Sequence, residues 1–142
     1  MGDTPVTPRQ ALIGSRIIWA ALLLGQVIFL CVILFLRRSG GPDAPPPPVL
    51  AYVAMLAVVV AAPIAFVMRK AMYGPPDDRG NIPPKKYAAG NLRFLAILEG
   101  VSMLGLVIFL AGDPLGLASS GVAMAIQAVN FPMGTAMGID TV

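Results

Sequence analysis

The sequence predicts an all-α membrane protein, a bundle of four transmembrane helices within a single domain over residues 1–142. The chain is 57 % hydrophobic and only 12 % charged, and a soluble domain of this length could not bury so much apolar surface. Its apolar residues also gather in runs of about 20, the length at which a helix rising ~1.5 Å per residue crosses a ~30 Å hydrocarbon core.

The first two expected spans are the most apolar. The first covers residues 17–36, between Arg16 and the pair Arg37 and Arg38. Its apolar run is longer than the core of a signal peptide, and no small-residue cleavage site follows it, so we interpret it as a membrane span. The second covers residues 49–68 and ends at two basic residues.

The other two expected spans contain polar residues. The third covers residues 92–111 and carries a carboxylate, Glu99, well inside its ends. The fourth covers residues 115–137 and is the least apolar, with glycine, serine and amide side chains and Pro132 near its end. The short connection "GDPLG" predicts a tight turn, so these two spans should be antiparallel neighbours.

The distribution of basic residues predicts the orientation. An even number of spans places both termini and the middle loop, residues 69–91, on one side of the membrane. Lysine and arginine collect on the cytoplasmic side of short loops. The opposite side carries only Arg37 and Arg38, so we predict that both termini lie in the cytoplasm. The basic residues on the predicted cytoplasmic side are Arg9, Arg16, Arg69, Lys70, Arg79, Lys85, Lys86 and Arg93.

The two longer loops differ in composition. The middle loop mixes both charge signs with two Pro-Pro pairs and several glycines, so we expect it to be ordered only locally. The loop "RRSGGPDAPPPPV" contains a proline run, which predicts an extended polyproline spacer.

A faint internal repeat gives a second interpretation of the architecture, as two tandem helical hairpins. The first and third spans align without gaps when Phe35 is set against Phe109, and Leu36 then falls on Leu110. Repeats of this kind would be parallel, unlike the inverted repeats of many transporters.

Polar side chains of the expected spans lie at similar depths. At ~1.5 Å per residue, Glu99 lies about 10 Å from the cytoplasmic end of its span, and Gln26 and Gln127 lie about 13 and about 15 Å from the same side. Ser102 follows Glu99 on the same helix face. These four residues are the candidate site, and we expect them to meet in one layer, with Asn130 one turn closer to the surface.

The role of this layer has three interpretations. An ionised carboxylate inside a membrane helix costs roughly 2.5 to 3.5 kcal/mol, and no basic residue lies in the layer, so we expect Glu99 to be neutral and to donate a hydrogen bond. The layer could hold the helices together, at about 0.6 kcal/mol per interhelical hydrogen bond on average. It could instead bind an ion through Glu99, or contact a partner protein or lipid.

Small residues form a second pattern, which predicts close helix packing. Such surfaces let helix backbones approach each other, within one chain or between copies of it. In the second span they are Ala51, Ala54, Ala57, Ala61 and Ala65. In the fourth they are Gly116, Ser120 and Gly121, with Met124 on the same face.

The chain lacks the residues that several classes of function need. The chain has no histidine and a single cysteine, Cys31, so it offers no soft-metal site and no internal disulfide. It has no nucleophile beside a base and no phosphate loop, and its basic residues lie at membrane interfaces. We therefore expect no enzyme activity, cofactor, metal or nucleic acid. The expected partners are the lipid bilayer and either a larger membrane complex or further copies of the chain.

The stretch "LAILEGVSMLGLVIFLAG" resembles the second helix of the proteolipid c subunits of rotary ATP synthases, in which an acid binds the transported proton or sodium ion. The resemblance implies that Glu99 is an ion-binding carboxylate. The chain is also similar to small, uncharacterised four-helix bacterial membrane proteins, which share the first span, "LAILEG" in the third and a proline at the end of the fourth. That similarity implies the inner membrane of a bacterium.

The leading hypothesis is a small integral membrane protein that acts as an accessory or scaffold subunit through helix packing. The alternative is a proton- or sodium-translocating, c-like subunit that uses the intramembrane carboxylate of Glu99.

Overall fold

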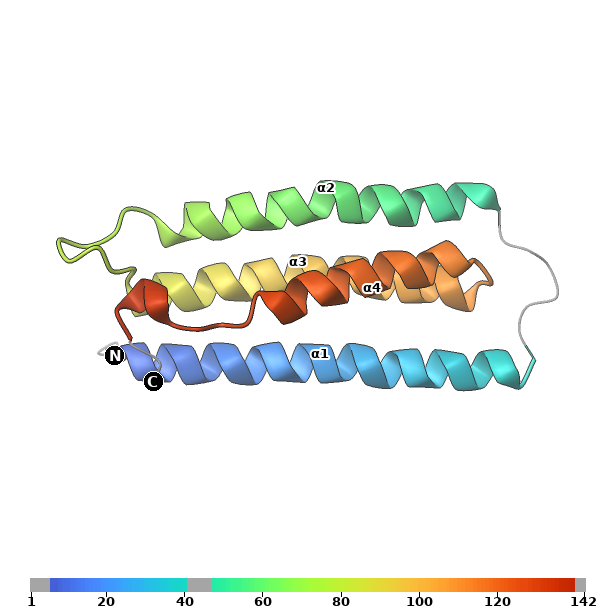
Figure 1. The fold of residues 1–142 in the computed structure, drawn as a ribbon, viewed down its shortest axis with the longest axis horizontal. Helices are drawn as coiled ribbons and strands as arrows, with labels where there is room; N and C mark the ends of the chain where they lie inside the picture. Colours follow the sequence, from blue (N-terminus) through green and yellow to red (C-terminus); the bar gives the residue numbers. More distant parts are fainter. Residues whose placement is uncertain (1–5, 41–46, 140–142) are drawn as a thin grey trace, which may run out of the picture.

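The computed structural model describes residues 6–40 and 47–139, and it confirms an all-α bundle (Figure 1). Three of its helices, the first three along the chain, are long and apolar enough to cross a membrane. The fourth is apolar but shorter. The helices are α1 (Pro8–Arg38), α2 (Pro48–Tyr73), α3 (Pro84–Leu110) and α4 (Pro114–Val129), followed by a short 3-10 helix, η1 (Thr135–Met137).

All four helices begin with a proline, which suits the first position because its fixed φ is helical and its missing N–H would have no partner there. Side chains cap two of these starts. Thr7 and Gln10 form a capping box at α1, each accepting a hydrogen bond from the backbone N–H of the other. At α4 the carboxylate of Asp113 accepts from the N–H of Leu115 at 2.9 Å. The sequence therefore sets where the helices begin.

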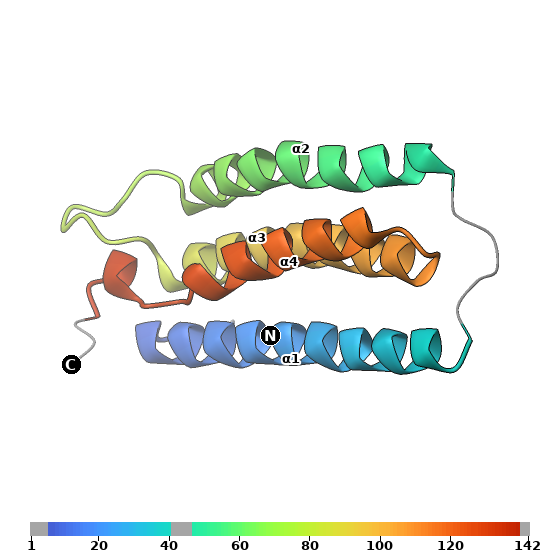
Figure 2. The same cartoon turned by 45° about the vertical axis from the view of Figure 1, so that its right-hand side comes forward.

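Helix α3 lies at the centre of the bundle and packs against α1, α2 and α4. Helices α1 and α2 lie on opposite sides of the pair formed by α3 and α4 (Figures 1 and 2). Within the most apolar 18-residue stretch of each helix, 50 % of the stretch in α3 is buried, but only 11 % of the stretch in α1. Among the described residues α3 and α4 form a closely packed hairpin, whereas α1 and α2 do not, which argues against two equivalent tandem hairpins.

The tight turn predicted between the third and fourth spans is present. Gly112 adopts a φ of 112°, which favours glycine, and Asp113 donates its N–H to the carbonyl of Ile108. Beyond the turn, Gly105 of α3 and Gly116 of α4 lie in direct contact. A Cβ atom at Gly105 would lie only 2.7 Å from the carbonyl oxygen of Gly116. The two helices are antiparallel neighbours whose backbones touch.

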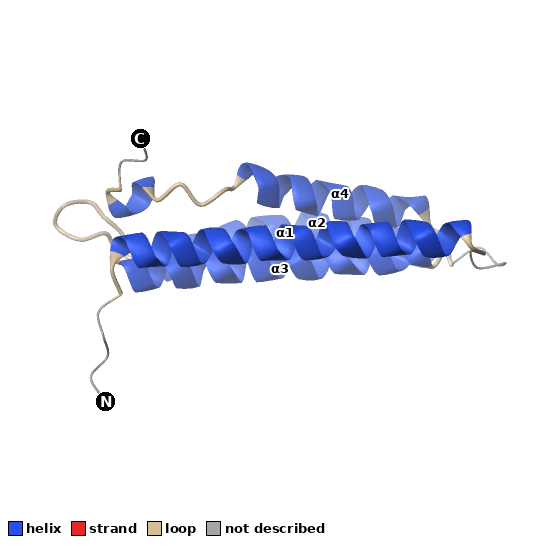
Figure 3. Ribbon diagram, turned by 90° about the horizontal axis from the view of Figure 1, so that it is seen from below, coloured by secondary structure: helices blue, strands red, loops and turns tan. Residues whose placement is uncertain are grey.

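The fourth span was predicted to continue to residue 137, but α4 ends at Val129. Asn130 terminates it, since its side-chain amide donates to the carbonyl of Ile126 at 2.9 Å. Pro132 has no N–H with which to continue the helix, and Gly134 has a φ of 84°. With 16 residues, α4 is about 24 Å long. The chain then runs without helix to η1, beside the start of α1 (Figure 3).

The middle loop is shorter and more ordered than expected. Because α2 continues to Tyr73 and α3 begins at Pro84, the predicted loop 69–91 reduces to residues 74–83. The carboxylate of Asp77 accepts from the N–H groups of Arg79 and Asn81 at 2.9 and 2.7 Å. The predicted polyproline spacer falls largely on residues 41–46, outside the described residues.

The alanines of α2 face the interior, as predicted for internal packing. Ala51, Ala54 and Ala65 are buried, and Ala57 and Ala61 are half-buried. Small side chains along this face let α2 approach α3 and α4 closely. Gly121, from the corresponding set in α4, does not contribute, since a Cβ atom there would meet open space.

Replacement of Gly105 by alanine tests the contact between α3 and α4. The added Cβ would lie 2.7 Å from the oxygen of Gly116 and 2.9 Å from the nitrogen of Ser120, both backbone atoms, so α4 must move. We expect Gly105→Ala to lower the free energy of unfolding in detergent by about 1–3 kcal/mol. Fluorescence of Trp19, the single tryptophan, can follow the unfolding.

Gly100→Ala is the matched control on the same helix, because a Cβ atom there meets nothing within 4 Å. We expect it to be neutral or to stabilise by up to about 1 kcal/mol through higher helix propensity. Equal stability changes in the two variants would contradict the close contact.

Candidate functional site

Gln26 and Gln127 form a hydrogen-bonded pair in the interior. Both side chains are fully buried, and Nε2 of Gln26 donates to Oε1 of Gln127 at 2.9 Å. Nε2 of Gln127 in turn donates to the carbonyl oxygen of Leu95 at 3.4 Å. The pair therefore links α1, α4 and α3 in one chain of hydrogen bonds, and the structure brings together two of the four residues expected to meet.

Ser102 has a different partner. Its hydroxyl shares a hydrogen bond of 2.8 Å with that of Ser120 on α4, and both residues are buried. The neighbouring Ser119 donates to the carbonyl oxygen of Ala54 on α2 at 2.9 Å. Ser102 thus joins α3 to α4 and takes no part in the glutamine pair. Ser120, which suggested only small-residue packing in the sequence, thus forms an interhelical hydrogen bond, and so does Ser119 beside it.

Glu99 does not join these residues. It is half-buried, and within the described part of the chain it forms no hydrogen bond or ion pair. The reason is its position around α3, whose buried face runs through Leu95, Leu98 and Ser102. A residue directly after Leu98 is turned by about 100° from it, which places Glu99 at the edge of that face. The expected single layer of four residues is therefore corrected to a glutamine pair, a serine pair and a separate carboxylate.

The glutamine pair also contains an unsatisfied acceptor. Oε1 of Gln26 is buried and has no hydrogen-bond partner in the structure. A buried acceptor without a donor costs about 1–3 kcal/mol. A substitution that supplies a donor to Oε1 of Gln26 should therefore stabilise the pair, and one that removes a donor from the pair should destabilise it.

Two side chains of α1 near the pair, Trp19 and Arg16, contact the end of α4, although the sequence indicated Arg16 only as a basic residue at the membrane interface and gave no role to Trp19. Trp19 donates its indole N–H to the carbonyl of Gln127 at 2.9 Å, and its ring packs edge-on against Phe131. Nε of Arg16 donates to the carbonyl of Pro132 at 3.1 Å. The signal in the sequence was the spacing of residues 16, 19 and 26, which puts all three on one face of α1.

Asn130, expected one turn from the polar layer, instead terminates α4 and accepts from Arg69. Nη1 of Arg69 lies 3.2 Å from Oδ1 of Asn130. The guanidinium also lies over two aromatic rings, 4.4 Å from the centroid of Phe94 and 5.2 Å from that of Phe66. The sequence placed Arg69 among the basic residues at the membrane interface, and the structure places it in a half-buried polar cluster.

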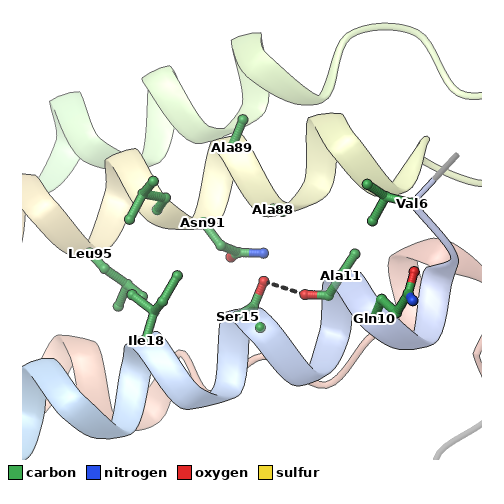
Figure 4. A pocket seen from close by; sticks show the side chains of 11 residues that line it. Val6, Gln10, Ala11, Ser15, Ile18, Ala88, Ala89, Asn91 and Leu95 are labelled. Carbon is green, nitrogen blue, oxygen red and sulfur yellow. Dashed lines mark hydrogen bonds between the residues drawn. The ribbon is translucent and has the colours of Figure 1, made fainter. Parts of the chain in front are cut away.

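An apolar recess of about 290 Å³ lies between α1 and α3, near the start of both helices (Figure 4). Its polar lining residues are already bonded: Ser15 donates to the carbonyl of Ala11 at 2.8 Å, and Asn91 bonds Tyr87 and Tyr73. The recess is therefore an apolar surface, and its polar side chains are not arranged around a common point as in a catalytic or ion-binding site. Residues that line it include Gln10, Ala11, Ser15, Ile18, Asn91 and Leu95.

Within the described residues, no group of three histidine, cysteine, aspartate or glutamate side chains could hold a metal ion. In comparisons with protein-family models, curated proteins and solved structures, nothing matches this chain.

A double-mutant cycle tests the glutamine pair. Gln26→Leu and Gln127→Leu each leave a buried amide without its partner, so we expect each to destabilise the protein by about 1–3 kcal/mol. The double variant should lose less than the sum, with a coupling of about 0.6 to 2 kcal/mol. Unfolding in detergent measures all three.

Ser119→Ala supplies the control for the cycle, because its hydrogen bond to Ala54 joins α4 to α2 instead of α1. Combined with Gln26→Leu, its effect should be additive within about 0.5 kcal/mol. Additivity of the two glutamine variants as well would mean that their hydrogen bond contributes nothing.

Proposed function

We propose that this chain is a small integral membrane protein that acts as an accessory or scaffold subunit through helix packing. The observation that carries the proposal is the exposure of α1. Only 11 % of its most apolar stretch is buried inside the bundle. Helix association in lipid depends on packing and on hydrogen bonds. The buried polar side chains described above bond within the chain, and this leaves α1 as a mainly apolar surface for another helix.

The exposed side of α1 has a regular pattern. Its members recur at intervals of three and four residues, as in a helix that packs along a second helix. They lie opposite Trp19 and Gln26, which face the bundle. This α1 outer face consists of Ile17, Ala21, Leu24, Ile28, Cys31 and Phe35, all of them exposed.

We place the protein in the inner membrane of a bacterium with both termini in the cytoplasm. The support is the distribution of charge along the bundle. The start of α1, the loop 74–83 and η1 lie at one end (Figure 1), together with most of the basic residues, and we call this the basic end. Arg37 and Arg38 lie at the other. The positive-inside rule assigns the basic end to the cytoplasm.

The alternative function, translocation of protons or sodium ions by a c-like subunit, draws support from Glu99, which lacks an internal partner among the described residues. An ion site needs several ligands around one point, however. Gln26, Ser102 and Gln127 each bond elsewhere in the bundle. The scaffold function therefore fits the polar residues better, and it needs no catalytic group.

A bulky residue on the α1 outer face tests the scaffold function. In mild detergent, we expect the wild-type chain to migrate with a larger complex. Ala21→Phe should release it by obstructing close helix packing, without changing the unfolding temperature of the free chain. Val59→Phe is the matched control, because Val59 is exposed on α2, and it should remain in the complex. A wild-type chain that migrates alone would contradict the proposal.

The fate of Glu99→Gln separates the two functions. Under the scaffold function, proteoliposomes that contain Glu99→Gln should show the same proton and sodium flux as wild type, because the carboxylate carries no ion. Loss of a wild-type flux in Glu99→Gln, together with sodium-sensitive labelling of Glu99 by a carbodiimide, would establish the alternative.

A further inference from the structure

A second cavity, of about 280 Å³, lies where α4 ends, and it differs from the apolar recess in having a polar lining. Arg69 and Tyr73 of α2 form one side, Tyr87 and Asn91 of α3 form another, and the segment 129–136 closes it. Each of the four side chains can form hydrogen bonds. The cavity brings together an arginine, two phenols and an amide at the basic end of the bundle.

Arg69 is held in place but retains unused hydrogen-bonding capacity. Its guanidinium lies over the rings of Phe94 and Phe66, and it donates one hydrogen bond, to Asn130. A guanidinium has five N–H donors. Among the described residues no carboxylate forms an ion pair with it. A fixed, half-buried guanidinium without an internal counter-charge is suited to bind an anion with two hydrogen bonds, as phosphate does.

The non-helical segment after α4 forms a wall of this cavity. Two contacts fix it: Gly134 donates its N–H to the hydroxyl of Tyr87 at 3.3 Å, and Arg16 donates to the carbonyl of Pro132. Non-helical backbone at membrane depth occurs where protein buries it or where it lines a polar cavity. Thr135, the first residue of η1, is exposed and also lines the cavity.

The cavity lies beside the point at which the apolar run of α2 ends, where a membrane span meets the phospholipid headgroups. Arg69 directly follows the apolar run of α2, and basic pockets between membrane helices bind anionic headgroups. Exposed apolar side chains lie beside the polar lining: Val129 is 77 % exposed and Met133 is 55 % exposed. An amphipathic ligand would therefore meet polar groups and apolar surface together.

We propose that this cavity binds a phosphate group, with Arg69 as its main anchor and Thr135 at its rim. The phosphate belongs either to an anionic phospholipid or to a soluble phosphate ester, because both present the same oxygens to the guanidinium. The site is independent of the α1 outer face, so it does not rest on the scaffold function.

The test uses the full chain in detergent with three added ligands, measured by native mass spectrometry and thermal unfolding. They are dioleoyl phosphatidylglycerol, dioleoylglycerol, which has the same acyl chains without phosphate, and inorganic phosphate. We expect Arg69→Gln and Thr135→Asp to lower the affinity for phosphatidylglycerol by about tenfold or more, through loss of a cation and through added negative charge. Dioleoylglycerol should bind weakly to every variant.

Two variants serve as matched controls. Thr135→Asn has nearly the size of Thr135→Asp without its charge, and Lys70→Gln removes a charge from an exposed residue adjacent to Arg69. We expect both to bind phosphatidylglycerol within about twofold of wild type, because exposed charges contribute little. If Arg69→Gln fails to fold, the comparison of Thr135→Asp with Thr135→Asn still tests the site.

The outcomes separate the two sources of phosphate. The expected pattern with phosphatidylglycerol supports a lipid site, and the same pattern of variants seen only with inorganic phosphate supports a site for a soluble phosphate ester. Equal binding of phosphatidylglycerol and dioleoylglycerol would overturn the proposal. An equal loss in Lys70→Gln and Arg69→Gln, or no difference between Thr135→Asp and Thr135→Asn, would overturn it as well.

Discussion

Hydrogen bonds from α4 hold the other three helices together. In lipid, apolar burial gives little preference for one helix arrangement over another, so packing and interhelical hydrogen bonds decide it. Gln127 bonds α1 and α3, Ser120 bonds α3, and Ser119 bonds α2. The contact between Gly105 and Gly116 brings α4 close enough to α3 for the serine bond to form. The shortest of the four helices is therefore hydrogen-bonded to all three long ones.

The early end of α4 has a second consequence. A helix end leaves carbonyl groups that need donors, and in a membrane protein other residues must supply them. At the end of α4, Trp19 donates to Gln127 and Asn130 donates to Ile126. Beyond the helix, Arg16 donates to Pro132. Trp19 and Arg16 thus attach α1 to the end of α4, and the chain that leaves the helix borders the polar cavity around Arg69. One interruption of a helix accounts for both features.

Much of this arrangement could be predicted from the sequence. Runs of apolar residues gave the three long helices, "GDPLG" gave the turn, and depth along the helices predicted that Gln26 and Gln127 would meet. Depth along a helix does not say which way a side chain points around the helix axis. The prediction that Glu99 meets the glutamines was therefore wrong, because Glu99 lies at the edge of the buried face of α3. The end of α4 was not predicted, because hydropathy alone does not show that Asn130 ends the helix. Its capping role depends on its hydrogen bond to the carbonyl of Ile126.

The two sides of α1 differ in what they contact within the bundle. Its inner side is fixed by hydrogen bonds from Arg16, Trp19 and Gln26 to α4 and the segment after it. The outer face lies on the opposite side of the helix and contributes none of these bonds. A partner helix could replace lipid along Leu24 and Ile28 without disturbing any internal contact. Association at this face would then add to the stability of the bundle, because no existing hydrogen bond has to break.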